Sequence, residues 1–361
     1  MSPCLSVILM SWEHTVKNYS VMDQALAFLA PYGPDLRNGL TSHAPMAVEA
    51  LAALGRADAV MPWLAHYSKG MLPRSAAHAP INADEWRTAL GKEPRFADWQ
   101  VFFENELKNV PWPAVLTLWT ERLAPGFCAS AMHGIIRVGH AVRSLGESET
   151  PARMRELAAG LGYWAAAYQT LPTTHTETPP ARALDAITKV PLVPHAQRKF
   201  SGTIVSSLEA LDEFPDFAPV IGLLDVKRDP SQTILDLSET FARVYLANAH
   251  DVLSTIVFVH SVTGVVTLRS LLPYLPETTT HALLRYAWQG SCALYSAFGQ
   301  SAPSTEAIEP PHESRDALID LAVANGDEHV MKFTEACLRE YDLNPSPVYL
   351  AAARHVRGIL Q

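Results

Sequence analysis

The chain has 361 residues, of which 48% are hydrophobic and 18% charged, and its formal net charge is −9. This length and composition predict a globular protein with a large apolar core. The acidic balance, without any block of Lys or Arg, argues against nucleic acid as a partner.

The cysteines and the apolar runs bear on location. The four cysteines are scattered without a Cys-x-x-Cys pair, which favours reduced thiols: Cys4, Cys128, Cys292 and Cys337. Residues 1–10 are apolar but lack the basic start and cleavage site of a signal peptide. No apolar run approaches the roughly 20 residues of a membrane span. Together these features predict a cytoplasmic protein with no membrane partner.

Helical patterns dominate the first half of the chain. The predicted helices cover residues 21–30, 41–55, 57–67, 98–107, 111–119, 132–143 and 153–170, with irregular structure and one short helix at 72–96. Thr41 or Ser42 is expected to cap the second helix, with Pro45 in its first turn and Gly55 at its end. His43 then lies at a helix entrance, where its side chain can point into a cavity.

The second half continues this pattern after a polar, proline-containing loop at residues 173–180 and a less regular stretch at 183–229. Further helices are predicted at residues 234–249, 252–272, 281–300 and 316–325, then one reaching 341 and a last one at the end. Residues 252–272 are rich in β-branched side chains, but the apolar run exceeds a typical strand, so we expect a buried helix. Without βαβ alternation or repeats, the sequence predicts an all-α fold: a single large, helical-bundle-like domain over residues 1–361 with its site buried between helices.

The stretch 132–143 carries an unusual polar stripe. His133 and His140 are seven residues apart, close to two helical turns, so both lie on one face with Arg137 between them. The other positions are apolar or Gly, which indicates a buried helix whose polar groups need partners. The two histidines are either ordinary core residues bonded to backbone or water, or they face a metal or substrate site.

Five histidines in apolar or helical segments come from four predicted helices: His43, His133, His140, His260 and His329. Histidines that converge from several helices of a bundle form a plausible transition-metal site. The alternative is again a set of core histidines. No HExxH, GxGxxG, P-loop or GxSxG motif is present, so other catalytic classes have less support.

Lys332 follows His329 by three residues and so lies on nearly the same face of an apolar segment. Its side chain either extends outward to solvent or is buried beside the site. Burial lowers the pKa of a lysine and favours the neutral amine, which can add CO₂ and become a carbamate with one negative charge. We therefore expect Lys332 to be a carbamylated metal ligand or a close partner of the ligands.

Several motifs keep one order along the chain: Ser-His-Ala-Pro-Met at 42–46, Met-His-Gly-Ile-Ile-Arg at 132–137, His-Ala-Val-Arg at 140–143, His-Ser-Val-Thr at 260–263 and His-Val-Met-Lys at 329–332. In these motifs the chain resembles the questin oxidase-like family of all-helical proteins, over roughly residues 20–340. Ser42 and Ala44 depart from the Asn-His-Gly-Pro form typical of that family, which bears on substrate fit more than on metal binding.

The resemblance implies an oxygenase of secondary metabolism that cleaves aromatic polyketides such as anthraquinones, formally by a Baeyer–Villiger-like ring opening. It also implies O₂ as co-substrate and a non-haem Fe(II) held mainly by histidine, with these candidate ligands: His43, His133, His140, His260 and His329. Arg137 is then expected to stabilise a substrate enolate or phenolate oxygen. The expected partner is a small aromatic substrate; the electron donor, NADPH or another, and the oligomeric state stay open.

Two other interpretations stay open as well. A metal-dependent hydrolase would use the metal to activate water. A non-catalytic helical protein would bind a small apolar ligand and use its histidines structurally. Metal analysis separates the three, because iron favours the oxygenase, zinc the hydrolase and no metal the non-catalytic protein.

Overall fold

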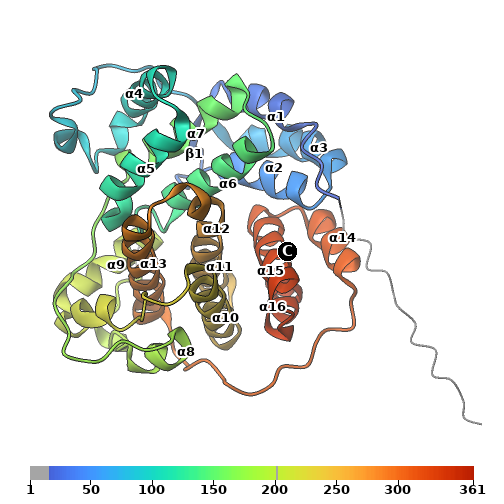
Figure 1. The fold of residues 1–361 in the computed structure, drawn as a ribbon. Helices are drawn as coiled ribbons and strands as arrows, with labels where there is room; N and C mark the ends of the chain where they lie inside the picture. Colours follow the sequence, from blue (N-terminus) through green and yellow to red (C-terminus); the bar gives the residue numbers. More distant parts are fainter. Residues whose placement is uncertain (1–15, 201) are drawn as a thin grey trace, which may run out of the picture.

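The computed structural model describes residues 16–200 and 202–361 (Figure 1). The apolar start at residues 1–10 and Cys4 therefore lie outside the described residues. The structure is 67% helical, with sixteen α-helices and one two-stranded sheet in its described part. This confirms the predicted all-α class.

The N-terminal part contains three helices and the small sheet: α1 (Met22–Leu29), β1 (Tyr32–Leu36), α2 (Ala44–Ala53), α3 (Ala57–Tyr67) and β2 (Met71–Pro73). The antiparallel pairing of β1 with β2 was not predicted. The expected cap of α2 was wrong, because His43 occupies the N-cap position. The Thr41 hydroxyl instead bonds the hydroxyl of Tyr163 at 2.8 Å, and the Ser42 hydroxyl accepts a long 3.4 Å bond from the Ala44 amide.

Four helices form the middle of the chain: α4 (Phe96–Asn109), α5 (Trp112–Leu123), α6 (His133–Glu147) and α7 (Pro151–Ala166). Helix α7 packs against both α4 and α6. Buried indole rings fill the space between α4 and α5, where Trp99 and Trp119 meet edge to face with centroids 5.7 Å apart. These two tryptophans are thus part of the core.

The C-terminal half contains α8 (Ala183–Ala186), α9 (Ile204–Leu208), α10 (Pro230–Asn248), α11 (Val252–Val266), α12 (Leu268–Leu271), α13 (Glu277–Phe298), α14 (Arg315–Asn325), α15 (Glu328–Leu343) and α16 (Pro347–Ile359). Short 3₁₀ turns interrupt the chain at Ser68–Gly70, Trp86–Ala89, Glu93–Arg95, Ala124–Gly126, Ile187–Lys189, His195–Gln197, Glu209–Glu213, Pro215–Gly222 and Leu272–Tyr274. The loop predicted at 173–180 is irregular, and the side chain of His175 is 84% exposed there.

Helix α11 and the turns that follow it form one long apolar segment. The segment Val252–Tyr274 is long and apolar enough to cross a membrane by length and composition, which corrects the expectation that no run approaches a span. However, 72% of its most apolar window is buried inside the molecule. A buried core helix of this kind passes the same test, so the segment is weak evidence for a membrane.

Helices from both halves of the chain meet where the site lies. Helix α2 packs against α6 and α15, while α11 packs against α6 and α15 (Figure 1). The larger apolar cluster contains residues from Met46 to Leu360. A second cluster beneath α1, α2 and α3 includes Met331 of α15. The N-terminal and C-terminal parts therefore share apolar packing around these four helices.

Helix α6 approaches α12 closely because Gly139 has no side chain. A Cβ built at Gly139 would overlap the hydroxyl of Thr267 and lie 3.0 Å from its carbonyl oxygen. Gly146, on the same helix, faces open space, and its nearest neighbour would be the Tyr274 hydroxyl at 3.7 Å. The first glycine is thus required by packing, and the second is not.

We predict that Gly139→Ala lowers the free energy of unfolding by about 1–3 kcal/mol, because the added methyl overpacks the α6–α12 contact. Gly146→Ala is the matched control and should be neutral, or stabilising by up to about 1 kcal/mol, because Ala favours the helix. Urea denaturation followed by circular dichroism measures both. Equal effects of the two substitutions would contradict this account of the contact.

Candidate metal centre

Four of the five predicted histidines converge in the interior. Nε2 of His133 lies within hydrogen-bonding distance of Nε2 of His43 and 3.0 Å from Nε2 of His260. The ring of His329 completes the cluster, with its centroid 4.5 Å from that of His43 and 5.6 Å from that of His260. All four side chains are buried. The structure thus confirms that His260 and His329 join His43 and His133 from the C-terminal half.

Each ring of this four-histidine cluster comes from a different helix. His43 is the N-cap of α2, and His133 is the first residue of α6. His260 lies in the middle of α11. His329 is in the first turn of α15, where the carboxylate of Asp327 caps the helix by accepting from the His329 and Val330 amides.

Hydrogen bonds at Nδ1 fix the tautomers. The Nδ1–H of His133 donates to the carbonyl oxygen of Ser130, and the Nδ1–H of His260 donates to that of Ile256 at 2.6 Å. Because a carbonyl oxygen only accepts, both rings carry their hydrogen on Nδ1 and present a lone pair at Nε2. Carboxylates act in the same way on the other two rings.

These carboxylates belong to neighbouring residues on α15. Nδ1 of His43 lies 3.4 Å from Oε1 of Glu328, and Nδ1 of His329 lies 3.2 Å from Oδ1 of Asp327. All four rings therefore have an acceptor at Nδ1, which leaves four Nε2 lone pairs for the interior. Outer acceptors of this type orient histidine ligands in metal sites.

The arrangement fits a bound transition metal. Burial, followed by the charge of Lys332, lowers the pKa of His133 to about 3, and burial also takes the pKa values of His43 and His260 well below their ordinary range. Neutral rings cannot share a proton across the 3.0 Å contact between His133 and His260. A shared cation would turn this close approach of two lone pairs into two ligand bonds.

Lys332 is buried beside the cluster, with 1% of its surface exposed. Within the described residues, its Nζ and the Nε2 of His329 have no hydrogen-bond partner. Burial lowers the pKa of Lys332 to about 8, although Glu328 and Asp327 act in the opposite direction. The alternative in which Lys332 extends into solvent is therefore wrong.

The structure does not bring His140 to the four-histidine cluster. His140 is buried on the same helix face as His133, as predicted, but its Nδ1 lies 2.6 Å from Oε2 of Glu49. The reason is the axial rise, because seven residues of α-helix advance by about 10 Å. One helix face can therefore serve two different sites.

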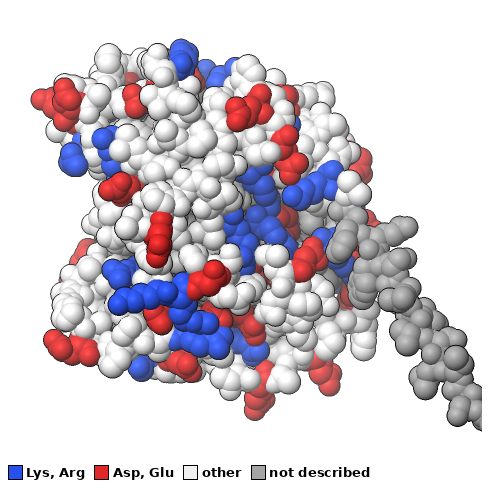
Figure 2. Space-filling model, in the orientation of Figure 1, with Lys and Arg blue, Asp and Glu red and all other residues white. Residues whose placement is uncertain are grey.

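Glu49 and His140 belong to a buried ion network that joins three helices. Arg143 of α6 donates from Nε to Oε1 of Glu49 on α2 at 2.7 Å, and it also binds Glu335 of α15. Figure 2 shows Lys and Arg side chains gathered where α6, α12 and α15 approach one another. A small pocket there is lined by Arg143, Lys332 and Arg339.

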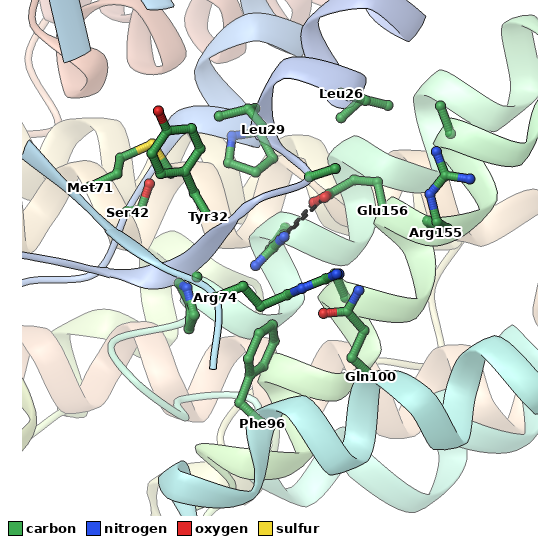
Figure 3. Close-up of a pocket in the computed structure, with 17 residues that line it drawn as sticks. Leu26, Leu29, Tyr32, Ser42, Met71, Arg74, Phe96, Gln100, Arg155 and Glu156 are labelled. Carbon is green, nitrogen blue, oxygen red and sulfur yellow. Dashed lines mark hydrogen bonds and ion pairs between the residues drawn. The ribbon is translucent and has the colours of Figure 1, made fainter. Parts of the chain in front are cut away.

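Arg137 also lies apart from the four-histidine cluster. Its Nε and Nη2 donate to the two carboxylate oxygens of Glu156 at 2.6 and 2.9 Å. Both residues line a cleft beside α1 and α2 (Figure 3). None of the four clustered histidines lines this cleft, but Ser42 and Pro45, on either side of His43 in the sequence, do.

Sequence reasoning missed several partners of these residues. Glu49 lies on α2 beyond His43, and Asp327 and Glu328 immediately precede His329, so a search for carboxylates near each histidine would have found all three. The carbonyl acceptors and Glu156 carried no such signal, because their roles depend on local backbone conformation and on the packing of α7 against α6.

The sequence model of the questin oxidase-like family matches residues 41–337. The chain belongs to the questin oxidase-like family. The matched region contains the four-histidine cluster and Lys332. A comparison with curated proteins found no match. Membership of the family implies an oxidoreductase and suggests an oxygenase that acts on aromatic polyketides.

The turn before α6 positions His133 in this questin oxidase-like protein. Ser130, Ala131 and Met132 have φ angles of 47°, 53° and 70°, so three consecutive non-glycine residues adopt the left-handed conformation. Such residues are strained by about 1–2 kcal/mol each. The turn directs the Ser130 carbonyl to Nδ1 of His133. The Met132 side chain anchors it against Gly264 and Gly290, where a Cβ would lie 2.6 and 3.2 Å from Met132 atoms.

We predict that Ala131→Gly is less destabilising than Ala129→Gly by about 1–2 kcal/mol. Both substitutions remove a buried methyl and add backbone freedom, but only position 131 has a positive φ that glycine relieves. Urea denaturation of the two variants and the wild type measures the difference. If the two variants lose equal stability, the turn is not strained in solution.

Proposed function

We propose that this protein is a non-haem iron oxygenase that uses O₂ to cleave a C–C bond of an aromatic polyketide or quinone, formally a Baeyer–Villiger-like ring opening. The observation that supports the proposal is the four-histidine cluster. Ring nitrogens of His43, His133 and His260 lie within 4.8 Å of one another, and the ring of His329 packs against those of His43 and His260. Imidazole suits iron among the first-row metals. Bound there, iron would supply the redox chemistry and the binding of O₂.

The chain's own residues would prepare the site. Asp327 and Glu328 accept hydrogen bonds from Nδ1 of His329 and His43 and so orient both rings. Burial of the cluster excludes bulk water. Arg137 is one turn beyond His133 and lines the cleft. We propose that Arg137 stabilises the substrate oxygen that gains negative charge, and that Glu156 holds the guanidinium in place.

Four imidazoles provide no negative charge to offset that of a divalent cation, and Lys332 can provide it. The lone pair of its neutral amine attacks the carbon of CO₂, an N–C bond forms, one C=O electron pair moves to oxygen, and the nitrogen releases a proton to solvent. The product carbamate carries one negative charge and two oxygen donors. Lys332 is among the residues that line the small pocket between α6, α12 and α15, from which CO₂ would reach the amine.

We predict that wild-type protein purified without chelator contains close to one equivalent of iron, and that His260→Ala lowers this sharply because one of four nitrogen donors is lost. His175→Ala is the control, since that side chain is exposed in the 173–180 loop. Elemental analysis by mass spectrometry measures the metal. Zinc in place of iron would favour the hydrolase, no metal would favour a non-catalytic protein, and unchanged iron in His260→Ala would exclude that ligand.

For Lys332 we predict that wild-type protein equilibrated with ¹³C-bicarbonate shows a carbamate signal in its ¹³C NMR spectrum, and that Lys332→Ala and Lys332→Arg do not. Both variants should also lose iron, since Ala has no amine and a guanidinium stays charged. Lys227→Ala, at an exposed position, serves as control. A Lys332→Ala protein with full iron and full turnover would rule the carbamate out.

A further inference from the structure

The cleft beside α1 and α2 has the walls of a ligand site. It opens to solvent, and its empty volume, counted with the adjoining open space, is about 560 Å³. Apolar side chains form much of its lining, among them Leu26, Leu29, Met71 and the ring of Phe96. Such walls suit a flat aromatic molecule.

The charge of the cleft is opposite to that of the whole chain. Three guanidiniums and one carboxylate line it: Arg74, Arg137, Arg155 and Glu156. The chain as a whole has a formal charge of −9. Arg137 and Glu156 neutralise each other through two hydrogen bonds. Two positive charges are therefore left, and these attract anions into an apolar cleft.

Arg74 is better placed than Arg155 to contact a ligand. Figure 3 shows the Arg74 side chain extending across the cleft toward Gln100, above the ring of Phe96, whereas Arg155 lies beyond Glu156 at the far side. The Arg74 amide donates to the carbonyl of Pro31 at 2.8 Å, so the backbone that carries this side chain is fixed. Within residues 16–200 and 202–361, the structure assigns the Arg74 guanidinium no ion pair.

The cleft shares two chain segments with the four-histidine cluster, although none of the four histidines lines it. Ser42 and Pro45 line it, and His43 lies between them in the chain. Arg137 lines it from α6, one turn beyond His133. An aromatic molecule in the cleft would thus lie against the two segments that supply His43 and His133.

We infer that this cleft binds an aromatic substrate with an ionised oxygen, a carboxylate or a phenolate, on one edge, and that Arg74 binds this oxygen. The inference rests on the proposed function for the identity of the ligand as substrate. Arg74 is then a specificity-determining residue, because its planar, doubly donating guanidinium matches an anionic oxygen pair and is left unpaired by a neutral edge.

Isothermal titration calorimetry without oxygen, where turnover cannot occur, tests the inference. The probes are anthraquinone-2-carboxylate, its neutral carboxamide and 2-hydroxyanthraquinone, titrated into the full-length protein as purified. We expect wild type to bind the carboxylate about tenfold or more tightly than the carboxamide. Arg74→Gln should lose about tenfold or more in affinity for the carboxylate and less than about twofold for the carboxamide. Arg74→Lys should fall in between.

The control is Arg285→Gln, an exposed arginine of α13 outside the cleft, which should bind all probes as wild type does. The phenol probe, titrated below and above its ionisation, shows whether a phenolate suffices. The inference is overturned if wild type does not bind the carboxylate, if Arg74→Gln binds it normally, or if Arg74→Gln weakens the carboxylate and the carboxamide equally.

Metal content separates this inference from the proposed function. Arg74→Gln should keep the iron of wild type, because Arg74 lies in the cleft and not in the four-histidine cluster. Wild-type protein without iron but with Arg74-dependent binding of the carboxylate would contradict the oxygenase and leave the anion site intact. Protein that contains iron and consumes oxygen, but binds the carboxylate and the carboxamide with equal affinity, would contradict only the anion site.

Discussion

The close approach of unprotonated imidazole nitrogens in the interior is the constraint on which the rest of this structure depends. Three of the four Nδ1 acceptors lie within four residues of their own histidine: Ser130, Ile256 and Asp327. Only Glu328 reaches a histidine from another helix, His43. Three of the tautomers are therefore fixed by residues close in the chain. The approach of ring nitrogens of His43, His133 and His260 to within 4.8 Å instead requires tertiary packing, because their lone pairs repel one another unless a cation lies between them.

The ion network around Arg143 provides part of that packing. It joins α2 through Glu49, α6 through Arg143 and His140, and α15 through Glu335. These are three of the four helices that carry the clustered histidines. Removing either carboxylate from a buried guanidinium that both hold strongly destabilises the folded protein, because it leaves an uncompensated buried charge. His140 thus belongs to a structure that positions the site, which explains why it lies on the same helix face as His133 and away from the cluster.

The sequence predicted the helices, the burial of the histidines and the convergence of four of them, because apolar periodicity and buried polar groups are both visible in one chain. The sequence did not predict features that depend on the distance between two residues along a helix, or on a partner residue from another helix. The seven-residue spacing of His133 and His140 gives the face but not the separation, and Glu156 pairs with Arg137 only because α7 packs against α6. The left-handed turn at Ser130–Met132 contains no glycine that would have indicated it.

The distribution of carboxylates on α15 gives Lys332 its distinctive chemistry. Glu335 is taken by Arg143 and lies 3.8 Å from Arg339, while Asp327 and Glu328 face the Nδ1 atoms of two histidines. In the described part of the chain, none of them hydrogen-bonds the Lys332 amine. A buried ammonium without a bonded anion is costly, and the neutral amine is the form that burial favours. The acidic groups of this helix thus pair with guanidiniums and imidazoles, and the amine of Lys332 lies buried beside the four-histidine cluster without a bonded anion.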